Sequence, residues 1–113
     1  MSSSVLQKLD SLYKKGKYAE CHKMALESLA SQGLRMEVLK YRIFASDKLK
    51  MHSECKSLIE FYLTYNPIDI DVIKIKIQVL KSNREFAELS EYLDYLTANI
   101  PINLDQINLT TVP

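Results

Sequence analysis

Apolar residues recur at helical spacing along most of this chain. Val5, Leu9 and Leu12 share one face of a first predicted helix, and Cys21 and Ala25 share one face of a second. The same spacing predicts four further helices, over residues 37–48, 53–65, 69–81 and 84–98. The pattern therefore predicts an all-α protein of paired helices.

One stretch also fits a strand. DIDVIKIKIQVL, residues 69–80, alternates apolar and polar positions and is rich in β-branched side chains. We predict a helix there, because Ile73 and Ile77 form one helical face while Val72 and Val79 form another. A helix between two neighbours needs two apolar faces. Acidic residues at the start of the stretch also favour a helix N-terminus.

The sequence matches itself at a shift of 34 residues. Three units align without insertion, and each contains an aromatic-type position, a glutamate, an apolar position and a closing Gly or Pro. The matched sets are Tyr18, His52 and Phe86; Glu20, Glu54 and Glu88; Leu9, Ile43 and Ile77; and Gly33, Pro67 and Pro101. The first set is expected to pack after each turn. The repeat predicts three copies of one helical hairpin.

A 34-residue helix-turn-helix unit ending in Pro resembles the tetratricopeptide repeat family, and LYKKGKYAECHKMAL is the stretch most similar to it. The resemblance implies a right-handed α-α superhelix, or solenoid, of about three repeats. Its units would cover about 2–35, 36–69 and 70–101 within a domain of residues 1–101. The repeats are divergent, because Leu9, Ile43 and Ile77 replace a family glycine and Leu89 replaces a small residue.

The end of the chain is too short for another hairpin. Residues 102–113 are expected to form an extended or capping tail, or else to begin a fourth unit of a longer protein. An apolar face on the last helix, if uncovered, would favour homodimerisation through the C-terminal repeat. The residues assigned to self-association or capping are Leu89, Tyr92, Leu93, Tyr95 and Leu96.

Composition and charge narrow the class of protein. The 113 residues fit one domain, 47% of them are hydrophobic, and the net charge of +1 gives no strong attraction to nucleic acid. The charge is uneven: residues 1–84 hold all 15 Lys and Arg against nine acids, and residues 85–113 hold five acids and no base. No membrane span or signal peptide is predicted, so we expect a cytoplasmic or nuclear protein.

Two cysteines and two histidines raise the question of a metal site. Cys21, His22, His52 and Cys55 are chemically suitable zinc ligands. However, Cys21 and Cys55 occupy a repeat position that requires a small apolar side chain, and a buried free Cys behaves as one. Leu89 holds that position in the third unit. We therefore expect packing roles, no metal and no cofactor.

Catalytic chemistry has little support. Only Gly16 and Gly33 are present, so there is no Gly-rich phosphate loop. No Cys–His pair with a third orienting group is evident beyond Cys21 and His22. The protein is therefore not expected to be an enzyme.

By the family's geometry, the first helix of each pair lines a concave face. The residues expected to bind a partner there are Tyr13, Lys14, Lys40, Phe44, Lys48, Lys74 and Lys81. Lysines beside aromatic rings suit an acidic peptide or a terminal carboxylate, and the alternative is an ordinary solvated basic face.

These observations predict a non-catalytic protein–protein interaction scaffold or adaptor. It would be a subunit or N-terminal region of a larger multiprotein assembly, with another protein or a peptide as partner. The alternative is a helical-repeat RNA-binding protein, since such arrays look similar. Three units would read few bases, and the near-neutral charge disfavours nucleic acid.

Overall fold

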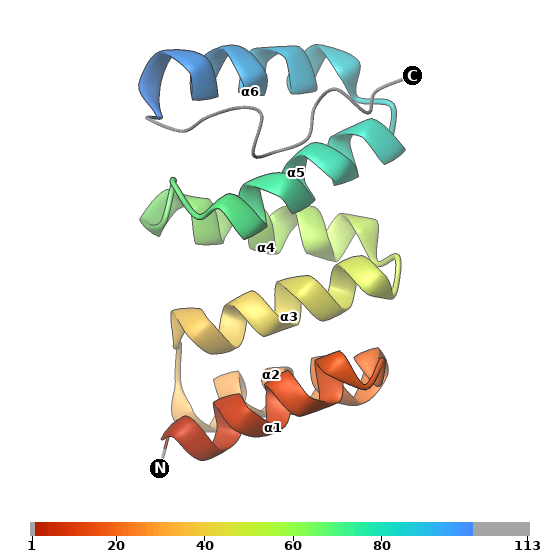
Figure 1. The fold of residues 1–113 in the computed structure, drawn as a ribbon, viewed down its shortest axis with the longest axis vertical. Helices are drawn as coiled ribbons and strands as arrows, with labels where there is room; N and C mark the ends of the chain where they lie inside the picture. Colours follow the sequence, from red (N-terminus) through yellow and green to blue (C-terminus); the bar gives the residue numbers. More distant parts are fainter. Residues whose placement is uncertain (1, 101–113) are drawn as a thin grey trace. The chain divides into compact units, whose positions relative to one another are not determined.

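The 34-residue repeat is visible in where the helices begin. The computed structural model describes residues 2–100, and the predicted tail lies outside them. Six helices occur in this described part, with no strand, so the all-α prediction is confirmed. They are α1 (Ser2–Lys14), α2 (Tyr18–Gln32), α3 (Met36–Lys48), α4 (His52–Tyr65), α5 (Ile70–Ser82) and α6 (Phe86–Asn99), shown in Figure 1. Successive odd-numbered and even-numbered helices each start 34 residues apart.

The strand-like stretch is helical, as predicted. The Asp69 carboxylate caps α5 by accepting a hydrogen bond from the Asp71 N–H at 3.2 Å. Val72 and Ile73 are both fully buried, and Ile77 and Val79 are nearly so. Burial on two sides explains the unusual apolar content of this helix.

The turn inside each hairpin repeats in atomic detail. Gly16, Lys50 and Arg84 lie 34 residues apart and have φ values of 77°, 62° and 58°. Each is the left-handed residue of a Schellman motif, in which two N–H groups beyond the helix satisfy its last carbonyls. The longer bonds of the three motifs run from Lys17 to Leu12 (2.9 Å), Met51 to Ser46 (3.0 Å) and Glu85 to Leu80 (2.9 Å).

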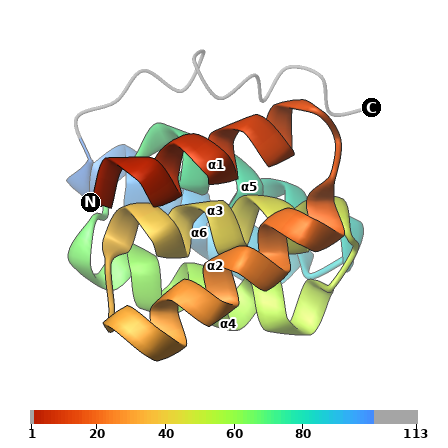
Figure 2. The ribbon, with the colours of Figure 1, turned by 90° about the horizontal axis from the view of Figure 1, so that it is seen from below.

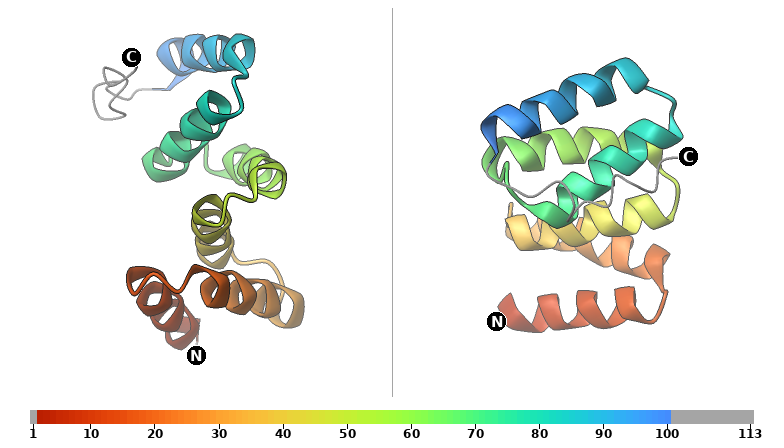
Figure 3. Two further views of the ribbon diagram at one scale, coloured as in Figure 1. Left: turned by 90° about the vertical axis from the view of Figure 1, so that its right-hand side faces the viewer. Right: turned by 45° about the horizontal axis from the view of Figure 1, so that its top comes forward.

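The described part of the chain divides into two compact units: unit 1 ends at Tyr62 and unit 2 begins at Leu63, so the boundary lies inside α4. In unit 1, α1 and α2 form a hairpin against which α3 packs (Figures 2 and 3). Its core includes five residues with no exposed surface: Leu9, Cys21, Ala25, Val38 and Ala45. Small residues on α2 thus allow α3 to approach closely.

In unit 2, α5 and α6 form the corresponding hairpin. The buried residues of its core are Ile73, Ile77, Leu80, Tyr92, Leu96 and Ile100. Leu63, Leu89 and Leu93 pack against this core and are partly buried.

The predicted packing role is wrong for Phe86, which is 59% exposed. Tyr18 has a ring partner in Tyr13, with ring centroids 5.3 Å apart. Lys81 occupies the position of Tyr13 in the third repeat. Phe86 therefore lacks the aromatic neighbour that covers Tyr18.

Candidate partner-binding face

Four aromatic rings gather on unit 1, from α1, the start of α2, and α3. The Tyr13 ring lies 5.3 Å from the Tyr18 ring and 5.6 Å from the Phe44 ring, measured between centroids. The Tyr41 and Phe44 rings meet edge to face at 6.0 Å. All four are half-buried, so they pack on one another and still present ring surface to solvent. We call these four residues the aromatic cluster.

Charged groups border the aromatic cluster. Asp10 accepts hydrogen bonds from the Tyr41 hydroxyl at 2.8 Å and from Lys14 Nζ at 2.9 Å. Both hydrogen bonds lower the pKa of Asp10, and the bond from Lys14 has the larger effect. Burial, aided by the nearby Asp10 carboxylate, raises the pKa of Tyr41 to about 12, so its hydroxyl remains a donor. Lys40 Nζ lies 5.7 Å from the centre of the Phe44 ring.

The structure brings together part of the predicted binding set. Tyr13, Lys14, Lys40 and Phe44 belong to this one region of unit 1, and Lys48 is exposed on the last turn of α3. Lys74 and Lys81 lie on α5 in unit 2, where Lys74 is exposed and Lys81 is half-buried. The candidate face is therefore defined by unit 1 alone.

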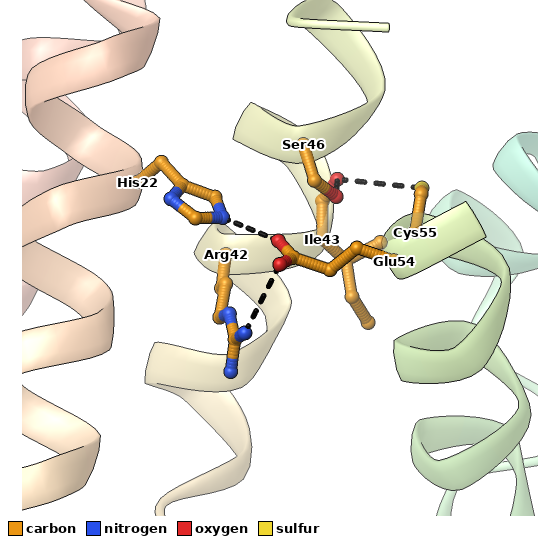
Figure 4. A network of polar contacts seen from close by, with 6 residues as sticks. All are labelled: His22, Arg42, Ile43, Ser46, Glu54 and Cys55. Atoms are coloured by element: carbon orange, nitrogen blue, oxygen red, sulfur yellow. Dashed lines mark hydrogen bonds and ion pairs between the residues drawn. The ribbon is translucent and has the colours of Figure 1, made fainter. Parts of the chain in front are cut away.

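A second polar group connects three helices of unit 1 (Figure 4). The Glu54 carboxylate on α4 accepts a hydrogen bond from His22 Nε2 on α2 at 2.6 Å. Its other oxygen lies 3.4 Å from Arg42 Nη2 on α3. Burial raises the pKa of Glu54, but the His22 hydrogen bond and the Arg42 charge outweigh it, and the net pKa is lowered. This carboxylate ties the first hairpin to the second.

Both cysteines are internal. Cys21 and Cys55 have no exposed surface, and each S–H donates to a carbonyl twelve residues earlier. The acceptors are Leu9 at 3.6 Å and Ile43 at 3.8 Å, which are themselves repeat equivalents. Figure 4 shows the second of these contacts. Burial raises the pKa of the Cys21 thiol to about 11. Both side chains thus serve the packing of a hairpin.

The predicted self-association residues have mixed environments. Leu96 is fully buried and Tyr92 is 9% exposed, so both belong to the core of unit 2. Leu89 and Leu93 pack on the edge of that core. Tyr95 is exposed and stacks against Tyr92 with ring centroids 6.2 Å apart. Lys76 Nζ lies 4.1 Å from the centre of the Tyr92 ring.

The sequence interpretation missed two cross-hairpin contacts and one ring of the aromatic cluster. It did not assign Tyr18 or Tyr41 to a binding face, nor Glu54 to a link with His22. Tyr41 lies 31 residues after Asp10, and Glu54 lies 32 after His22. Each separation is two or three residues shorter than the 34-residue repeat. That regular spacing could have predicted that these residues of neighbouring hairpins lie close together.

Comparisons with known proteins identify no relative: no family model, curated protein or solved structure matches the chain. Among residues 2–100, no helix has the length and apolar character needed to cross a membrane. In the same described part, no three His, Cys, Asp or Glu side chains form a group that could hold a metal ion.

Proposed function

We propose that this protein is a non-catalytic interaction module, built as a right-handed superhelix of three helical hairpins of the tetratricopeptide type. In this proposal it binds a peptide segment of another protein and serves as an adaptor or subunit of a larger assembly. The observation that carries the proposal is the half-exposed aromatic cluster bordered by lysines on α1 and α3.

The chemistry of this face favours an acidic peptide with at least one apolar side chain. Rings that are already packed lose little freedom when they bind, and aromatic residues are common anchors of interfaces. Lys14, Lys40 and Lys48 supply ammonium groups for carboxylates. Asp10 is already engaged by Lys14 and Tyr41, which reduces its repulsion of an acidic ligand.

Recurrent geometry supports the superhelix. The Schellman turns recur at the same position of every unit, and the thiol–carbonyl bonds recur in the first two. Repeat proteins bury a continuous core by stacking such units, which leaves an extended surface for partners.

Peptide display on the purified full chain, followed by calorimetric titration, tests this function. Selection from a random library is expected to enrich peptides with Asp or Glu beside an aliphatic or aromatic residue. Phe44→Ala should weaken binding of a selected peptide by about tenfold or more, and Lys48→Glu should weaken it without altering the fold. Phe61→Ala on α4 is the matched control, because Phe61 is exposed and lies outside the cluster.

Selected peptides that bind Phe44→Ala and Lys48→Glu as tightly as wild type would refute this site. Helical circular dichroism spectra of both variants must match that of the wild type, so that weaker binding reports the face and not unfolding. Failure of the library to yield any binder would count against peptide recognition altogether.

A further inference from the structure

The first two hairpins pack on each other through buried residues of α2 and α3. On the first hairpin, Cys21 and Ala25 of α2 are fully buried, and they share a core cluster with Val38 and Ala45 of α3. At the border of the same junction, Asp10 meets Tyr41 and Tyr13 meets Phe44. At this junction the second hairpin covers one face of the first, which we call the trailing face of a hairpin, and it does so with its own leading face.

The trailing face of the third hairpin is more open. The residues 68 positions after Cys21 and Ala25 are Leu89 and Leu93, which are partly buried where the originals are fully buried. Ser90 holds the position of His22, which contacts the following hairpin, and Ser90 is exposed. Phe86, at the position of Tyr18, is 59% exposed.

The leading face of the first hairpin is open as well. Ser11 is exposed, although its equivalent in the second hairpin, Ala45, has no exposed surface. Beside Ser11 lies an apolar groove of about 380 Å³, lined by Lys8, Ser11, Leu12 and Met24. Small or polar residues at this end of the chain leave a groove open to solvent, whereas the equivalent residue of the second hairpin is buried against the first hairpin.

The two open faces complement each other in size. Leu89 and Leu93 are larger than Cys21 and Ala25 on the trailing side. Ser11 is small, and the groove beside it is hollow on the leading side. Larger side chains opposite a hollow restore the volume balance that close packing requires.

The two faces also complement each other in polarity. Applying the repeat to the contacts Tyr13–Phe44 and Asp10–Tyr41 places Lys81 opposite Asp10 and Gln78 opposite Gln7. Lys81 and Asp10 carry opposite charges, and the two glutamine amides can each donate and accept a hydrogen bond. Residues 85–100 carry four acids and no base, whereas residues 2–17 carry four lysines and one aspartate.

From this complementarity we propose that the chain associates with a second copy of itself head to tail, the trailing face of α5 and α6 packing on the leading face of α1. The interface is heterologous and leads to open chains or rings. A symmetric contact of α6 with α6 is disfavoured, because it would bring two acidic helices together. The inference rests on the hairpin stacking of the proposed function and not on peptide binding.

Sedimentation velocity of the full chain, from about 5 µM to about 500 µM, measures the association. The wild type should show a concentration-dependent rise in mass that high salt weakens. Ser11→Arg disables the leading face and Ser90→Arg the trailing face, and each should raise the dissociation constant at least about tenfold, because a long side chain in place of serine prevents close packing of the two faces. Ser57→Arg, at an exposed serine of α4, is the control and should associate like wild type.

Mixing the two disabled variants distinguishes head-to-tail from symmetric association. Each variant keeps one intact face, so the equimolar mixture of Ser11→Arg and Ser90→Arg should form a dimer that grows no further. A mixture that stays monomeric, a wild type that is monomeric at the highest concentration, or equal loss of association in Ser57→Arg would each overturn the proposal. Peptide binding by a monomeric wild type would then leave the proposed function standing without this interface.

Discussion

The recurring left-handed residue of the hairpin turns provides a direct test of the repeat geometry. Lys50 occupies, at φ 62°, the position that Gly16 holds at φ 77° in the first hairpin. A residue with a Cβ in this conformation costs about 1–2 kcal/mol relative to its favoured regions. Glycine avoids this cost but loses about 0.5–1 kcal/mol more backbone entropy on folding. Lys50→Gly should therefore stabilise the protein by about 0.5–1 kcal/mol.

Urea unfolding followed by circular dichroism measures the free energy of unfolding. Gly16→Ala should lower it by about the same amount, and the cause would be backbone strain alone, because an added Cβ meets no atom within 4 Å. Lys15→Gly is the matched control. It also replaces a lysine by glycine, but at the residue before the left-handed position of the first hairpin. It should destabilise the protein by about 0.5–1 kcal/mol. Destabilisation by Lys50→Gly equal to that of the control would refute the assigned turn.

Three further predictions concern buried groups. The folded pKa of Cys21 is raised to about 11 from 9.0, so the stability that its protonated thiol contributes should be complete below about pH 9 and lost as the pH rises towards 11. In urea unfolding at a series of pH values, the free energy of unfolding should therefore fall less steeply with pH in Cys21→Ala than in the wild type. The pKa of Glu54 is lowered, so its contribution to stability should be present above the usual value of 4.5 and lost as the pH falls through the lowered pKa. Glu54→Gln should cost about 1–2 kcal/mol at neutral pH and flatten the acid limb of the same measurement. An unchanged acid limb would contradict the role of this carboxylate in linking three helices. Leu96→Ala should cost about 2–5 kcal/mol, because Leu96 is fully buried; a loss below 1 kcal/mol in thermal or urea unfolding would show that this position is not core.

Helices were the most predictable part of this protein. In α5 the sequence has both strand-like alternation and two helical apolar faces. The Asp69 cap and the position of this segment in the repeat favoured the helix over the strand. These signals are local or periodic, so one sequence contains them. The buried thiols followed from the same register, since the repeat assigned Cys21 and Cys55 to one packing position.

Contacts that depend on a particular neighbour were less predictable. Phe86 occupies an aromatic position of the repeat, but Lys81 replaces the tyrosine that would cover it, so the position alone gave the wrong environment. The bond between Glu54 and His22 crosses from one hairpin to the next, and its existence depends on how the helices pack. Side-chain pairing across hairpins requires interhelical geometry that a periodic pattern does not specify.

The central claim is that α1 and α3 present a peptide-binding face centred on Phe44. An amide ¹H–¹⁵N correlation titration of the full chain with a display-selected acidic peptide tests it most directly. The largest shifts are expected at Tyr13, Lys40 and Phe44, with little change at Phe61. Largest shifts on the part of α2 beyond Tyr18, or none anywhere on α1 and α3, would contradict this claim.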